Sequence, residues 1–174
     1  MNLKNNNNLK YIIMKKITLI LAFIGMMTLQ SCSTEDNDTI SEVFEYTNVD
    51  FLPNDYTVVL SYPHSIYSSD MVLVYRLSGS FQGDDIWKPL PETYYFDDGT
   101  LDLRYDFDFT RYDAEVKIEG YDLAGVSNAF KLNQILRVLV IPASFGKNSS
   151  VNYKDYKEVV KAYHIDESKV IKVQ

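Results

Sequence analysis

The chain has 174 residues, and its hydrophobic fraction of 46% and aromatic fraction of 14% suit one folded domain rather than a disordered protein. The formal net charge is −7, and since four lysines but no acidic residues precede Cys32, the rest of the chain carries 13 basic and 24 acidic residues, a net charge of −11. Such a surface repels phosphate backbones, so we expect no nucleic-acid partner.

Residues 1–31 have the composition of a secretory signal peptide. A pair of lysines precedes an apolar run from Ile17 to Leu29, and a small residue follows before the expected cleavage point. This run is shorter than the ~20 residues that cross a bilayer as a helix. The asparagine-rich residues 1–13 show no packing pattern, so the sequence also indicates Met14 as the true start.

The end of this segment, Leu29-Gln30-Ser31-Cys32, resembles the lipobox of bacterial lipoproteins. In that motif signal peptidase II cleaves before the cysteine, whose thiol carries diacylglycerol. The resemblance therefore implies that Cys32 is lipidated, although Gln30 departs from the small residue more common there. Cys32 is the only cysteine, which excludes an intrachain disulfide, a thiol nucleophile and a cysteine metal site in the rest of the chain.

Residues 32–42 are polar and acidic without periodicity, which predicts a flexible tether. The segment resembles the acidic export signal of Bacteroidetes surface lipoproteins, and Ser33 is not the aspartate that retains enterobacterial lipoproteins in the inner membrane. The resemblance implies an outer-membrane lipoprotein facing the periplasm or the cell surface. Asp38-Thr39-Ile40 matches the short O-glycosylation motif of that phylum, with Thr39 as the acceptor.

Beyond the tether, residues 43–174 alternate strand-like runs with turn signals every eight to twelve residues. This spacing predicts a mainly β domain, an antiparallel β-sandwich with immunoglobulin-like layers, or a barrel. Pro89 and Pro91 restrict their strand to an edge of a sheet. The expected strands are 43–49, 56–62, 71–77, 86–91, 92–96, 101–109, 114–121, 135–141 and 168–173.

The central hairpin carries the clearest strand signal. From Leu101 to Phe109 apolar residues alternate with charged ones over nine positions, which fits a strand with one buried and one solvated face. Asp98-Gly99 is a strong signal for a two-residue hairpin turn.

That turn favours a register in which Phe96 faces Leu101 and Tyr94 faces Leu103. A three-residue loop with a bulge would instead set Tyr95 opposite Leu101, and this alternative stays open.

One segment has helical rather than strand periodicity. Apolar residues from Tyr153 to Tyr163 recur at helical spacing, Asn152 is placed to cap the helix, and Asp155 follows three residues later. We expect a single short C-terminal α-helix that lies across a sheet edge or an open end. A partner-binding helix is the alternative.

Three motifs together resemble a family of uncharacterised Bacteroidetes lipoproteins, some with collagen-like tethers. They are Tyr94–Gly99, Arg137–Ala143 and Tyr153–Ile165, and the similarity covers roughly residues 43–167. The resemblance implies no catalytic residues. Some members carry a dihydrolipoamide dehydrogenase label, but this chain has no Gly-x-Gly-x-x-Gly after a strand, no redox cysteine pair and too few residues for two nucleotide domains.

Acidic turns are the only candidates for a metal site. Asp84-Asp85 and Asp97-Asp98 could supply oxygen ligands to calcium. Solvated acidic turns are the favoured interpretation, and the row Asp102, Asp106 and Asp108 is likewise expected to form a solvated strand face. Aspartates two residues apart on one strand are ~7 Å from each other, too far to share an ion.

The two histidines, His64 and His164, lack partners at metal-ligand spacing, so neither is expected to be a ligand or a base. Several aromatic residues could form a platform for stacking sugars, although core packing is the favoured interpretation of tyrosines on strands. These residues are Tyr62, Tyr67, Trp87, Tyr94, Tyr95, Tyr105 and Tyr112.

The sequence therefore predicts a non-enzymatic, lipid-anchored envelope protein with a structural or binding role and no cofactor. Its expected partners are the membrane, through the lipid anchor, and other envelope proteins or glycans. The alternative is a calcium- or glycan-binding accessory domain of a surface complex.

Overall fold

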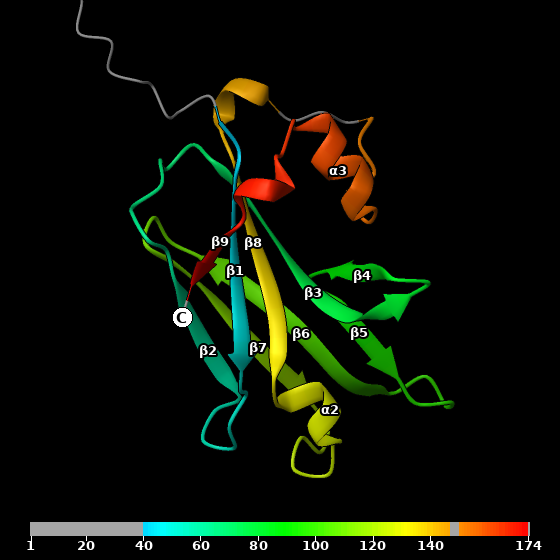
Figure 1. Cartoon of the computed structure of the whole chain (residues 1–174). Helices are drawn as coiled ribbons and strands as arrows, with labels where there is room; N and C mark the ends of the chain where they lie inside the picture. Colours follow the sequence, from blue (N-terminus) through cyan, green and yellow to red (C-terminus); the bar gives the residue numbers. More distant parts are fainter. Residues whose placement is uncertain (1–39, 147–149, 174) are drawn as a thin grey trace, which may run out of the picture. The chain divides into compact units, whose positions relative to one another are not determined.

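A computed structural model describes residues 40–146 and 150–173, which form two stacked β-sheets (Figure 1). The five-stranded sheet has the order β4-β3-β8-β1-β9, and the four-stranded sheet has the order β2-β7-β6-β5. The strand bounds are β1 Glu42–Val49, β2 Thr57–Ser61, β3 Met71–Phe81, β4 Asp84–Pro89, β5 Glu92–Tyr95, β6 Leu101–Phe109, β7 Asp113–Gly120, β8 Gln134–Ile141 and β9 Ile171–Val173.

The predicted β-sandwich with one short C-terminal helix is confirmed. The nine expected strands correspond to the nine in the described ranges, and β4, with Pro89, lies at a sheet edge as expected. Strand β1 begins at Glu42, inside the range 32–42 that the sequence assigned to the tether. The expected signal peptide, lipobox, Cys32 and Thr39 lie outside the described residues.

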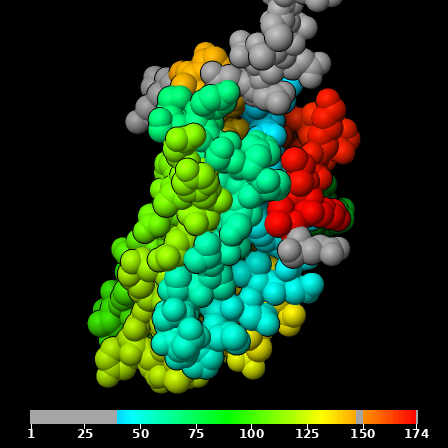
Figure 2. Space-filling model, turned by 90° about the vertical axis from the view of Figure 1, so that its left-hand side faces the viewer, coloured from blue at the N-terminus to red at the C-terminus, as the bar shows by residue number. Residues whose placement is uncertain are grey.

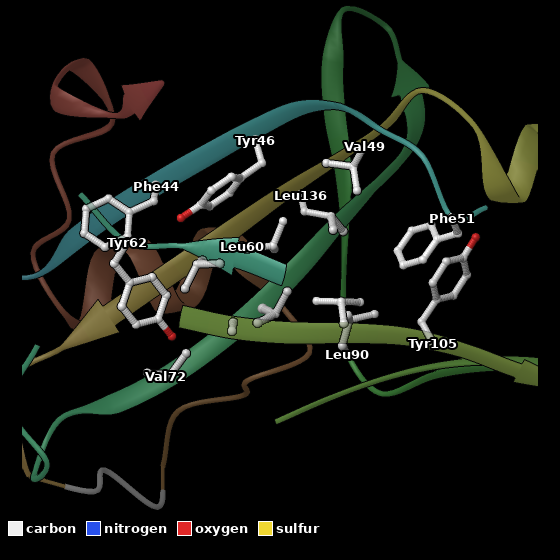
Figure 3. Close-up of a cluster of buried hydrophobic side chains, with 14 of the residues drawn as sticks. Phe44, Tyr46, Val49, Phe51, Leu60, Tyr62, Val72, Leu90, Tyr105 and Leu136 are labelled. Atoms are coloured by element: carbon white, nitrogen blue, oxygen red, sulfur yellow. The ribbon is translucent and has the colours of Figure 1, made fainter. Parts of the chain in front are cut away.

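Alternation along each strand builds the core between the sheets. In β6, Leu103 and Tyr105 are fully buried, whereas Arg104 between them faces out and binds Asp106. Figure 3 shows the inward side chains of both sheets meeting in one apolar layer. Its labelled members are Phe44, Tyr46, Val49, Phe51, Leu60, Tyr62, Val72, Leu90, Tyr105 and Leu136.

The strand order has two features that the sequence did not specify. Within the described residues every strand pair is antiparallel except β1 with β9. Strand β1 lies between β8 and β9, antiparallel to the first and parallel to the second. Strands β1 and β2 lie in different sheets, whereas the first two strands of an immunoglobulin constant domain share one. The domain therefore has immunoglobulin-like layers with a different strand order.

The favoured hairpin register is right along the strands and wrong at the tip. Tyr94 pairs with Leu103 as expected, but the register then shifts, and Tyr95 rather than Phe96 pairs with Leu101. The open alternative, with a bulge, is thus correct at that position. The Phe96 N–H donates to the Thr100 carbonyl at 2.9 Å, which closes a wider turn than two residues allow.

Helix α3 (Tyr156–Ala162) is shorter than the expected 153–163 and has a different cap. The Asp155 carboxylate accepts from the Glu158 N–H and caps the helix, while Asn152 accepts from the Lys154 N–H in the turn before it. The prediction of Asn152 as the cap was wrong because both residues suit that position and the later one begins the helix.

Helix α3 packs on the outer face of the five-stranded sheet, near edge strand β4, rather than across an open end (Figure 1). Tyr156 and Val159 are buried there against Tyr75 and Leu139. This second layer covers the apolar outward residues of β3 and β8, among them Tyr75, Leu139 and Ile141.

A four-residue helix, α2 (Asn128–Lys131), was not expected from the sequence. Two 3₁₀ turns, η2 (Ala143–Phe145) and η3 (Glu167–Lys169), flank the α3 region. In the described ranges, every helix is too short or too polar to cross a membrane.

Candidate functional site

A cavity of about 290 Å³ opens at one end of the sandwich, and we call it the loop-end cavity. It lies beside the start of β1, the loop between β2 and β3, and the turn between β6 and β7. Its lining residues are Ile40, Glu42, His64, Ser65, Ile66, Tyr67, Asp70, Arg111, Val140 and Pro142.

Backbone hydrogen bonds hold the two loops of the cavity together. The Tyr62 N–H donates to the Tyr112 carbonyl at 2.8 Å, and the Ile66 N–H donates to the Arg111 carbonyl at 2.9 Å. The Asp70 N–H then donates to the Tyr67 carbonyl, which closes a turn before β3. In Figure 2 the teal-green β2–β3 segment lies next to the yellow-green β6–β7 segment at the upper part of this face.

Arg111 is the cationic group of the cavity. Its Nε donates to the Ile66 carbonyl at 3.1 Å, which fixes the guanidinium in place. The other three arginines each bind a carboxylate, but Arg111 makes no ion pair with any residue of the described ranges. An arginine fork with free Nη atoms is suited to a planar, two-oxygen anion.

Asp70 is the buried acidic group of the cavity, with only 9% of its surface exposed. Its Oδ2 accepts from the Tyr67 N–H at 3.0 Å. Its Oδ1 is buried and receives no hydrogen bond from the part of the chain that the structure describes. Buried carboxylate oxygens ordinarily accept a hydrogen bond, and Asp70 Oδ1 departs from this rule within the described residues.

Glu42 and His64 form a pair at the rim of the cavity. His64 Nε2 lies 3.2 Å from Glu42 Oε1, and Nδ1 lies 3.3 Å from the Ser65 carbonyl oxygen. The ring of His64 stands edge-on to Phe44. Both ring nitrogens thus contact acceptor oxygens, Nε2 a carboxylate and Nδ1 a backbone carbonyl.

A second hollow, which we call the hairpin–helix groove, lies between the β3–β4 hairpin and the start of α3. It is wide and shallow, about 670 Å³, and contains the predicted calcium candidates Asp84 and Asp85. Lys157 Nζ lies 2.8 Å from Asp84 Oδ2, and this hydrogen bond lowers the pKa of Asp84. Asp84 is therefore already paired with a cation within the chain.

The remaining acidic candidates lie elsewhere. Asp97 and Asp98 are in the β5–β6 turn, where Asp98 Oδ1 accepts from the Thr100 N–H and hydroxyl, and these bonds lower the pKa of Asp98. Nowhere in residues 40–146 and 150–173 do three histidine or acidic side chains come together as metal ligands would.

No family model, curated protein or solved structure matches this chain.

The predicted aromatic platform does not assemble as a unit. Tyr62, Trp87 and Tyr105 are buried in the sandwich or under α3, as the core interpretation expected. Of the exposed ones, Tyr67 lines the loop-end cavity, while Tyr95 lies on a different hairpin.

Two arginine clusters were not foreseen, because each arginine lies in an apolar strand run. Arg76 points between the sheets and binds Glu92. Arg137 points outward, stacks 4.2 Å from the Trp87 ring and bonds Tyr156 under α3.

Three charged residues of the loop-end cavity were also not foreseen as a group. Glu42, Asp70 and Arg111 are far apart in the sequence. They line one cavity because the start of β1, the β2–β3 loop and the β6–β7 turn reach the same end of the sandwich. The available signal was position, since Asp70 immediately precedes β3 and Arg111 lies in the tight turn after β6.

Proposed function

We propose that the protein is a lipid-anchored envelope protein that acts by binding a small ligand in the loop-end cavity, without catalysing a reaction. Two charged groups in one cavity carry the proposal: within the described residues Arg111 makes no ion pair, and Asp70 Oδ1 receives no hydrogen bond. Polar and charged groups that converge on a cavity at the loops of a rigid scaffold are typical of recognition sites. The lipobox ending at Cys32 supports attachment to the outer membrane, facing the periplasm or the cell surface.

A structural role in a larger envelope complex is the other option for a lipid-anchored, non-enzymatic protein. That role would not use the loop-end cavity. The glycan-binding alternative is favoured over the calcium-binding one by a specific observation. The carboxylates that could bind calcium are dispersed over separate turns in the described ranges, whereas the loop-end cavity joins polar groups to the exposed ring of Tyr67.

The anchor is tested by cell fractionation. Cys32→Ala removes the thiol that carries the lipid, so the protein should leave the membrane fraction and lose label from radioactive palmitate. Ser33→Ala, the neighbouring change, serves as the matched control and should stay in the membrane fraction. A Cys32→Ala protein that still fractionates with membranes contradicts the anchor.

The binding role is tested by thermal shift with a panel of neutral, amino and acidic sugars. A ligand at ten times its dissociation constant stabilises the folded state by about 1.4 kcal/mol, which shifts the melting temperature measurably. Tyr67→Ala should reduce the shift, whereas Tyr121→Ala, an exposed tyrosine outside the cavity lining, should not. The absence of a shift with every sugar contradicts glycan binding.

A further inference from the structure

The chemistry of the loop-end cavity narrows the class of ligand, and this inference rests on the proposed binding role. We infer that the cavity binds a sugar acid, a hexuronate whose carboxylate is held by Arg111 and whose hydroxyls donate to Asp70 and Glu42.

The carboxylate follows from Arg111. Three of the four arginines use their guanidinium groups on carboxylates at 2.7 to 2.9 Å: Arg76 on Glu92, Arg104 on Asp106 and Arg137 on Glu45. Arg111 lacks such a carboxylate within the described residues, and the bond from its Nε to the Ile66 carbonyl leaves its two Nη atoms for an incoming group. Two bonds to the two oxygens of a ligand carboxylate would repeat the arrangement that Arg76 makes with Glu92.

Asp70 and Glu42 indicate that the ligand carries hydroxyl groups. Carboxylate oxygens accept hydrogen bonds, so Asp70 and Glu42 are suited to hydroxyl donors on a ligand. Glu42 Oε1 contacts His64, and Asp70 Oδ2 is used by Tyr67, but Asp70 Oδ1 has no donor among described residues. A simple inorganic anion would satisfy Arg111, yet unlike a sugar acid it would bring few hydrogen-bond donors for the two carboxylates.

The size and the apolar surface fit one sugar ring. A volume of about 290 Å³ is at the lower end of the range for small-molecule sites. The exposed lining residues Ile40 and Tyr67, with 61% and 54% of their surface exposed, supply apolar surface for the C–H groups of a ring. A sugar acid combines one carboxylate, several hydroxyl donors and an apolar ring face, and it therefore complements all three parts of the lining.

The test is isothermal titration of the purified full-length protein in detergent with glucuronate and with glucose. The two sugars share their ring hydroxyls and differ at one carbon, which is a carboxylate in the first and a hydroxymethyl group in the second. Because a hydrogen bond to a charged group contributes about 1.5–3 kcal/mol, glucuronate should bind at least about tenfold more tightly.

Arg111→Ala should weaken glucuronate binding at least about tenfold and leave glucose binding unchanged. The matched control is Arg104→Ala, because Arg104 lies on the outer face of the four-stranded sheet and is paired with Asp106 and Glu119. That variant should bind glucuronate as the wild type does. Thermal melts of both variants verify that they fold.

Equal affinity for glucose and glucuronate, or an unchanged affinity in Arg111→Ala, overturns the inference. If glutamate or alanine binds and glucuronate does not, the cavity recognises an amino-acid zwitterion and the inference also fails. A neutral sugar whose binding depends on Tyr67 would leave the proposed binding role intact while refuting the sugar acid. If no titrant produces heat of binding, both the sugar-acid inference and the proposed binding role are refuted.

Discussion

Replacing Glu92 by glutamine should destabilise the domain severely, because Glu92 neutralises a cation in the core. Arg76 and Glu92 extend from opposite sheets, and their side chains are only 5% and 8% exposed. Arg76 Nε donates to Glu92 Oε2 at 2.9 Å, and Nη2 donates to Oε1 at 3.2 Å. Glu92→Gln keeps the shape of the side chain but leaves the guanidinium charge without its buried counter-ion.

Breaking a buried pair by removing one partner costs about 3–5 kcal/mol, whereas a whole domain is stable by only about 5–15 kcal/mol. Glu92→Gln should therefore lose a large fraction of the free energy of unfolding. The double variant Arg76→Met with Glu92→Gln removes the stranded charge, so it should be more stable than Glu92→Gln alone.

The pH dependence gives a second measure of the same pair. Burial by itself raises the pKa of Glu92, but hydrogen bonds from Arg76 and Tyr94 outweigh it and lower the pKa below its usual value of 4.5. A lowered folded-state pKa contributes stability above the unfolded value. That contribution is lost as the pH falls below about 4.5 and through the folded-state pKa, and Glu92→Gln should lack this share of the acid dependence.

Urea unfolding of the chain from residue 32 with Cys32→Ala measures these effects. Its only tryptophan, Trp87, is buried under Arg137 and Tyr156, so its fluorescence should change when the domain unfolds. A loss below about 1 kcal/mol in Glu92→Gln, or a double variant no more stable than the single one, would refute the reasoning on the buried pair.

Three further predictions concern α3 and the start of the chain. Asp155→Ala removes the bond to the Glu158 N–H and should lower the free energy of unfolding by about 1 kcal/mol in the same urea assay; no change would contradict its role as the cap. Val159→Ala truncates a fully buried side chain on the inner face of α3 and should lower the free energy of unfolding by about 2–3 kcal/mol. A loss below about 1 kcal/mol would contradict close packing of α3 on the sheet. If translation starts at Met14, Met14→Ala should abolish expression on an immunoblot while Met1→Ala should not, and the reverse result contradicts that start.

The strands could be predicted because each carries its own signal. The alternation from Leu101 to Phe109 marks both the strand and its buried face, and Leu103 and Tyr105 are indeed fully buried. The turn at Asp98-Gly99 was located correctly. Its register depended on whether Asp97 or Phe96 pairs with Thr100, and local sequence does not determine that Phe96 does.

The sheet order and the cavity could not be predicted because they depend on contacts between distant segments. The apolar positions Leu73 and Leu139 show that the outer face of the five-stranded sheet is covered, but not what covers it. In the same way, a lone arginine in the turn after β6 has no local partner that would mark it. Arg111 becomes a site residue only when the loop that carries Asp70 closes over it.

Strand β9 protects the edge of the five-stranded sheet from pairing with another copy of the chain. Strand β9 pairs only three residues, Phe44 with Ile171, Glu45 with Lys172 and Tyr46 with Val173, yet it occupies the open side of β1. Truncation before Ile171 would expose amides and carbonyls of β1 that now pair with β9, and another copy of the chain could use them to extend the sheet. Deletion of β9 should therefore promote self-association, and it also removes Val173 from the edge of the core.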